Sequence, residues 1–169
     1  MGLGLYVYRI AGLSVNLNKY KVKVMRDTML RQQRDFEFFE AYREALKTNV
    51  FANQREAVDY VRTHPAPRWY VSREFCAAVL SSLLRGKDHY KMGKSKRRMF
   101  DALLRLYQEK RQDPSFSDMK HAELCDYIIS QPAPEWFIGY ERADDIIPTL
   151  SCAAHKMAIL RTMPQLSVP

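Results

Sequence analysis

The residues best suited to do chemistry in this chain are basic side chains that gather near its middle. From Arg85 to Arg98, fourteen residues include seven lysines or arginines and one acid. Lysine and arginine neutralise phosphates, and that interaction supplies most of the sequence-independent affinity of proteins for nucleic acids. The stretch thus predicts contact with a polyanion, DNA more than RNA.

The helix predicted just before this stretch, over residues 72–85, adds a face of its own. Opposite its apolar stripe lie Arg73, Ala77, Ser81 and Arg85, at steps of four residues. Small residues between two arginines let a helix approach DNA closely, as the third helix of a tri-helical DNA-binding domain does. The predicted nucleic-acid contacts are Arg73, Ser81, Arg85, Lys87, Lys91, Lys94, Lys96, Arg97 and Arg98.

Two observations weigh against a helix-turn-helix. The connector between the second and third predicted helices is about eight residues, longer than the three or four of the strict motif. An exposed arginine face is also ordinary on any helix at a protein surface. The alternative interpretation is a module that binds protein through aromatic connectors, as an assembly component of a phage or mobile element would.

Other chemistries find little support. Gly93-Lys94-Ser95 resembles part of a phosphate-binding loop, but Asp88 stands where that loop needs glycine and no strand is predicted before it. No nucleophile elbow, paired-carboxylate motif or glycine-rich cofactor loop is present. The sequence therefore predicts a non-enzymatic protein without a cofactor.

Metal binding and core packing are competing interpretations of the histidines and cysteines. His121 with Cys125, and Cys152 with His155, have spacings that zinc could use. However, Cys125 takes the place of Val58 in the internal repeat described next, and cysteine is commonly buried for packing alone. We predict no metal.

The elements that position these residues follow from an internal duplication. Pro65-Ala66-Pro67-Arg68-Trp69-Tyr70 returns 67 residues later as Pro132-Ala133-Pro134-Glu135-Trp136-Phe137, and residues 56–74 and 123–141 are identical at eight of nineteen positions. Such repetition predicts two copies of one structural unit. Proline pushes the residue before it into an extended conformation, so each segment is expected to be an extended connector whose tryptophan packs into the core.

Apolar spacing predicts helices around the connectors. Phe36, Phe39, Tyr42 and Leu46 form one stripe, and Phe100, Leu103, Leu104 and Tyr107 form another. Asn53-Gln54-Arg55-Glu56 is a variant capping box that opens the second helix. Pro148 is expected to break the last helix, leaving a separate one near residues 149–161.

The predicted fold is all-α, with two tandem three-helix repeat units and a terminal helix. The first unit covers 28–86 and the second, divergent unit 99–163, joined by a basic connector over 87–98. Residues 1–27 are expected to be a loosely packed or disordered extension. Residues 1–24 show no helical period, and they could be a short hairpin or sequence upstream of a natural start at Met25 or Met29.

Composition limits the class of protein. Residues 1–98 carry a net charge of +11 and residues 99–169 one of −3, so a polyanion would meet the first half. Three scattered cysteines predict a reducing, cytoplasmic location. No apolar run approaches the roughly 18 residues of a membrane span, and Met1–Tyr8 lacks the basic region of a secretory signal.

Pro65-Ala66-Pro67-Arg68-Trp69-Tyr70-Val71-Ser72, followed by a helix, resembles a segment of small, basic, uncharacterised bacterial proteins from chromosomal islands and phage-like elements. The resemblance covers about half of the chain and rests on this short motif. It carries no activity with it. It implies a role with DNA or within a mobile element.

Overall fold

The computed structural model describes residues 17–87 and 91–162, and within them every regular element is helical. The all-α prediction is therefore confirmed for this part of the chain. The elements are α1 (Leu17–Thr48), α2 (Gln54–Thr63), α3 (Arg73–Leu84), α4 (Lys94–Gln112), the short 3-10 helix η1 (Pro114–Phe116), α5 (His121–Ser130) and α6 (Tyr140–Thr162).

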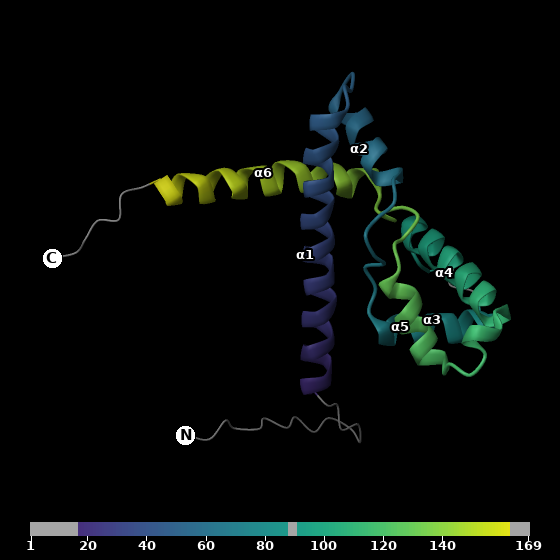
Figure 1. Cartoon of the computed structure of the whole chain (residues 1–169). Coiled ribbons are helices and arrows are strands. Elements are labelled where there is room, and N and C mark those ends of the chain that lie inside the picture. Colours follow the sequence, from purple (N-terminus) through teal and green to yellow (C-terminus); the bar gives the residue numbers. More distant parts are fainter. Residues whose placement is uncertain (1–16, 88–90, 163–169) are drawn as a thin grey trace, which may run out of the picture.

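The helices pack in two groups that do not follow chain order. α2 and α6 pack against α1 and against each other, while α3, α4 and α5 form the second group (Figure 1). These groups are not the contiguous units expected over 28–86 and 99–163. The third helix of each predicted unit packs with the first two helices of the other, because its connector carries the chain across.

The two connectors cross at a single antiparallel bridge. Ala66 and Ala133 exchange backbone hydrogen bonds, and both N···O distances are 2.9 Å. Each connector is also held further along: the Trp69 N–H donates to the carbonyl of Ile129, and the Trp136 N–H donates to that of Arg62. These four bonds obey the 67-residue offset, so a local twofold axis passes through the crossing.

Helix boundaries follow the same offset. Adding 67 to the bounds of α2 yields those of α5, and adding 67 to the first residue of α3 yields the first residue of α6. The Asn53 side chain accepts from the Glu56 N–H, as the predicted cap requires. The Glu56 carboxylate accepts from the Ala52 N–H.

Both tryptophans are buried in the core, as predicted. Trp69 is 2% exposed and stacks on Phe137, with ring centroids 5.2 Å apart; Trp136 is 4% exposed and stacks on Tyr70 at 5.7 Å. Trp69, Tyr70, Trp136 and Phe137 thus form two matching pairs across the axis. Each pair joins one connector to the other.

The predicted stripe of α1 is partly wrong. Phe39 and Tyr42 are buried, but Phe36 is 58% exposed and Leu46 is 47% exposed. Phe38 and Ala45 complete the buried face instead. The predicted stripe of α4 agrees better with the structure, since Phe100, Leu103 and Tyr107 are buried and Leu104 is half-buried.

Three predicted boundaries are also corrected. α1 begins at Leu17, within the extension predicted for residues 1–27, of which residues 1–16 lie outside the described part. α4 begins at Lys94, so the second half of the expected connector over 87–98 is the first turn of a helix. α6 runs through Pro148 without a break, because packing against α1 and α2 outweighs the lost backbone hydrogen bond.

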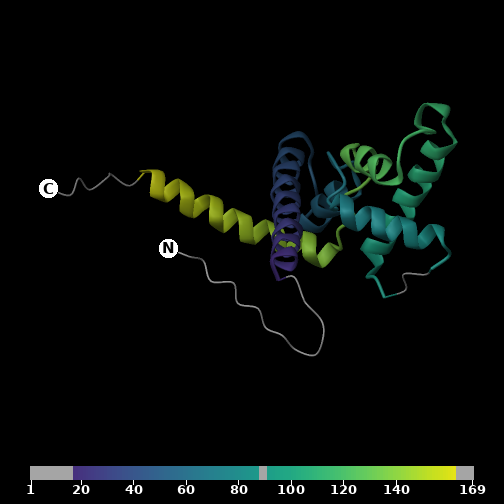
Figure 2. The ribbon, with the colours of Figure 1, turned by 90° about the horizontal axis from the view of Figure 1, so that it is seen from below.

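The two long helices reach beyond the other elements. The N-terminal part of α1 and the C-terminal part of α6 extend away from the remaining helices, as both views show (Figures 1 and 2). The starts of α3, α4 and α6 instead turn toward the middle of the molecule, where the candidate site lies.

Candidate functional site

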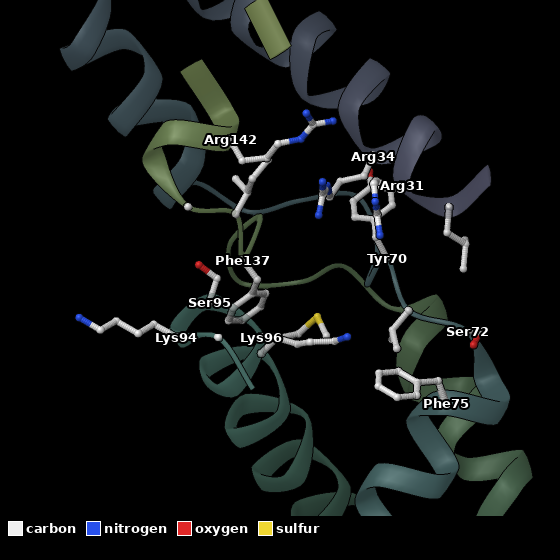
Figure 3. A pocket seen from close by; sticks show the side chains of 16 residues that line it. Arg31, Arg34, Tyr70, Ser72, Phe75, Lys94, Ser95, Lys96, Phe137 and Arg142 are labelled. Carbon is white, nitrogen blue, oxygen red and sulfur yellow. The ribbon is translucent and has the colours of Figure 1, made fainter. Parts of the chain in front are cut away.

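A cavity of about 590 Å³ lies where the two helix groups meet (Figure 3). It is lined by α1, by both connectors and by the first turns of α3, α4 and α6. Its basic lining residues are Arg31, Arg34, Lys94, Lys96 and Arg142, and no Asp or Glu of the described residues lines it. Such a concentration of positive charge in a concave site attracts anions, because low-dielectric walls focus the field.

The cavity lies on the local twofold axis, since much of its lining comes in pairs with the offset of the connectors. Tyr70 is matched by Phe137, Val71 by Ile138 and Ser72 by Gly139. Phe75 is matched in the same way by Arg142. Both halves of the repeat therefore contribute the same backbone positions to one site.

Three helices begin at the wall of this cavity. Gly93 precedes α4, Ser72 precedes α3 and Gly139 precedes α6, and all three residues line the cavity. Glycine has no side chain with which to cap the first backbone N–H groups, and Ser72 makes no capping hydrogen bond. The first N–H groups of a helix have no partner within it and carry partial positive charge, so they add to the attraction for an anion.

Ser72 has a side chain available for a ligand. The residue is only 7% exposed, and no hydrogen bond of its hydroxyl to another described residue is present. A seryl hydroxyl can both donate and accept a hydrogen bond, so Ser72 can bind an oxygen of a ligand in the cavity.

Two of the arginines are oriented by a carboxylate behind them. Asp35 is buried; its Oδ1 accepts from Arg34 at 2.7 and 3.1 Å, and its Oδ2 accepts from Arg142. On the other side, the Lys96 Nζ lies 4.5 Å from the centroid of the Phe75 ring. Arg31 and Lys94 are exposed. Asp35 neutralises part of the charge of the two arginines but holds their guanidinium groups in place.

Two half-buried aromatic rings complete the lining. Figure 3 shows Phe137 between the basic residues of α4 and those of α1, with Tyr70 nearby. Phe137 has a φ of 48°, the one positive value for a residue other than glycine among those described. That conformation is strained for a bulky residue, and strained residues cluster at functional sites.

Tyr70 is held by α1. Its hydroxyl donates to the Glu37 carboxylate. Burial and this hydrogen bond to a carboxylate raise the pKa of the Tyr70 phenol well above its ordinary value. Tyr70 therefore remains neutral at physiological pH.

Of the nine predicted contact residues, the structure brings Lys94 and Lys96 into this cavity and leaves the others outside its lining. Arg97 donates to the Met92 carbonyl at 3.4 Å, and Arg98 pairs with Glu135 of the second connector at 2.9 Å. Lys87 and Lys91 are exposed on the loop before α4.

The predicted face of α3 lies beside α5. Arg73 is 4.0 Å from the Asp126 carboxylate, the Ala77 carbonyl lies 2.9 Å from the His121 Nε2 atom, and Ser81 is half-buried. Arg85 is exposed and donates to the Ser81 carbonyl at 3.0 Å. Contact with α5 leaves less of this face open than the helical pattern suggested.

Sequence reasoning missed Arg31, Arg34 and Arg142. Arg31 and Arg34 lie at i and i+3, which places them on one side of α1, but nothing in the sequence shows which helix starts they face. The one usable signal was Gly93-Lys94-Ser95. It is not a phosphate-binding loop after a strand, yet it does begin a helix at a basic cavity.

Of the candidate zinc ligands, Cys125 is buried and His121 is hydrogen-bonded to other residues, whereas Cys152 is exposed. His121 Nδ1 lies 2.8 Å from the Tyr107 hydroxyl, so both ring nitrogens have protein partners. Cys76 and Cys125 are fully buried, and the neighbouring Cys125 thiol together with burial raises the pKa of the Cys76 thiol. No group of three or more potential metal ligands occurs within residues 17–87 and 91–162; the side chain of His155 lies outside the described ones.

Comparisons with known proteins return nothing: no family model, no curated protein and no solved structure shows a significant match to this chain. None of the described helices combines the length and apolar character required to cross a membrane.

Proposed function

We propose that this chain is a non-enzymatic nucleic-acid-binding protein whose main contact is the basic cavity. The observation that carries the proposal is the gathering of five basic side chains and three helix starts around one concave site with no acidic lining residue among those described. Phosphate oxygens are the groups that such donors favour. DNA is the first nucleic acid to test.

The basic stretch over residues 85–98 keeps a role in nucleic-acid binding, although the main contact is now the cavity. Lys94 and Lys96 belong to the cavity, and Lys87 and Lys91 lie before α4 on the chain. Long-range attraction by these exposed lysines would guide a strand toward the cavity. A role within a mobile element agrees with the resemblance of the first connector and stays part of the proposal.

We infer further that the cavity arose from the duplication itself. Matching helix bounds, the reciprocal Ala66–Ala133 bridge and the paired tryptophan stacks support two copies of one three-helix unit that exchange their third helices. The exchange would bring the starts of α3 and α6 to the same place. A single unit could not form the cavity.

The alternative is an interaction or assembly module. Met29 and Phe36 on α1 are exposed, which favours contact with another protein. The tryptophans of the connectors are buried, so such a partner would contact α1 in their place. This alternative does not require binding to DNA or RNA, so a nucleic-acid-binding experiment distinguishes the two hypotheses.

The test is fluorescence anisotropy with labelled DNA and RNA across a salt series. Wild-type protein should bind, with log Kd rising linearly with log salt. Arg31→Ala with Lys94→Ala should weaken binding and flatten the slope by about 1.8, since each phosphate contact contributes roughly 0.9. The matched control is Arg43→Ala with Lys47→Ala, which removes two exposed basic residues near the C-terminal end of α1, outside the cavity lining.

Two results would overturn the proposal. One is wild-type protein that binds no nucleic acid at low salt, which would leave the interaction module as the better hypothesis. The other is an equal loss in the control variant, which would mean that net charge, not the cavity, attracts the polyanion.

A further inference from the structure

We propose that the cavity binds one unpaired nucleotide of a strand, with the base against Phe137 and a phosphate at the start of α4. The inference rests on the proposed function and specifies its ligand. It predicts a preference for single strands, or for sites where a base leaves the duplex.

The first support is size. A volume of about 590 Å³ falls within the range of roughly 300–1,000 Å³ that pockets for small ligands occupy. One nucleotide fits such a space, and a duplex does not. A base that remains paired could therefore not reach the aromatic rings.

The second support is the aromatic lining. Phe137 is half-buried and lies at the cavity, with its ring stacked on Trp69 at an angle of 17° between the planes. That stack fixes the orientation of the ring before any ligand arrives. Bases stack on such preformed aromatic platforms with little regard to sequence, since every base has a flat π-face.

The third support is the set of donors beside the ring. Lys94 and Ser95 start α4, and the Ser95 hydroxyl lies near Gly139, where an added Cβ would be 3.8 Å from the hydroxyl oxygen. The Ser72 hydroxyl, just before α3, also lines the cavity and makes no capping hydrogen bond. A phosphate here would receive backbone N–H groups, a hydroxyl and an ammonium group, while Arg31 and Arg34 could contact its neighbour along the strand.

The experiment compares three probes on the wild-type protein: a twelve-residue thymidine strand, the same sugar-phosphate backbone without bases, and a duplex of equal length. The thymidine strand should bind at least about five-fold more tightly than the abasic backbone, as expected for one stacked base. It should also bind more tightly than the duplex at equal salt.

A protein variant tests the same point independently. Phe137→Leu should lose about five-fold or more in affinity for the thymidine strand while its affinity for the abasic backbone stays unchanged. Phe116→Leu is the matched control, because this half-buried ring makes a tilted contact with Tyr127 and is absent from the cavity lining. If Phe137→Leu does not fold, as judged by circular dichroism, the wild-type comparison of probes decides alone.

Equal binding of thymidine strand and abasic backbone would overturn the single-nucleotide inference while leaving a phosphate-binding function in place. Preference for the duplex would overturn it too, again without touching the proposed function. Absence of salt-sensitive binding to every probe would overturn both.

Discussion

The two sides of the cavity perform the same structural task with different chemistry. On one side Asp35 of α1 holds Arg142 of α6 by an ion pair, and on the other Lys96 of α4 lies over the Phe75 ring of α3. Phe39-Glu40-Ala41 matches Phe100-Asp101-Ala102 at an offset of 61 residues, and the same offset relates Asp35 to Lys96. Phe75 and Arg142 are related by the 67-residue offset of the connectors. The helix pairing is therefore the same on both sides, but an acid–base pair on one side is replaced by a lysine–aromatic pair on the other.

The same comparison can be made where the first residues of α2 and α5 contact α6 and α3. Gln54 of α2 donates to the Asp144 carboxylate of α6 at 2.9 Å, and His121 of α5 lies 2.9 Å from the Ala77 carbonyl of α3. Gln54 corresponds to His121, and Ala77 to Asp144. The same helix contact thus occurs with different side chains on the two sides, because burial of the apolar core does not depend on which polar pair lies at its edge.

The largest expected effect comes from removing the tryptophan stacks, which both sides of the cavity share. Trp69→Ala and Trp136→Ala should each lower the free energy of unfolding by about 3–5 kcal/mol, since each removes a buried ring and the stacking contact that this ring makes. Trp136→Ala should be the more severe, because Trp136 also meets the edge of Phe38 at 5.4 Å. Urea denaturation followed by circular dichroism measures both.

Tyr127→Ala serves as the control, since its ring is 36% exposed. A cost for either tryptophan no greater than that of Tyr127→Ala would contradict a structural role. It would point to an aromatic side chain kept for a partner.

A smaller effect on stability should differ between the two sides of the cavity. Asp35→Ala should cost about 1–3 kcal/mol, because it leaves Arg34 and Arg142 without their buried acceptor. Lys96→Ala should cost less than about 1 kcal/mol, since a cation–π contact of an exposed lysine contributes little. Urea unfolding at low and high salt distinguishes them; equal costs would mean that the ion pair does not position the arginines.

The smallest expected effect is a pH dependence of stability, and it arises from Tyr70 on one side only. The folded-state pKa of Tyr70 is raised above its ordinary value of about 10, whereas Phe137 at the equivalent place does not ionise. The neutral phenol therefore stabilises the fold below about pH 10, and this contribution falls as pH rises above that value. Near about pH 10.5 the loss should stay below about 1 kcal/mol.

Tyr70→Phe should remove that part of the alkaline loss. The measurement is the free energy of unfolding at several pH values from about 8 to about 10.5 for both proteins. Burial also raises the pKa of Tyr42, so some loss should remain in the variant. Identical pH profiles would show that the hydrogen bond of Tyr70 to Glu37 does not affect stability.

Much of this protein follows from local sequence patterns. Apolar residues spaced three and four apart, the Asn53 cap and the prolines of both connectors predict all-helical structure with extended connectors, and the repeat predicts two buried tryptophans. These features depend on near neighbours along the chain. They could be predicted because backbone conformation and burial respond to residues a few positions away.

Only tertiary structure decided how the helices pair. The connectors carry α3 to α4 and α5, and α6 to α1 and α2, and this arrangement brings Arg31, Arg34 and Arg142 to the same cavity as Lys94. Packing also kept α6 helical through Pro148 and turned Phe36 outward. A contact between residues far apart in the sequence leaves no local pattern, because its free energy arises from the shape of the assembled core and not from the chain around each residue.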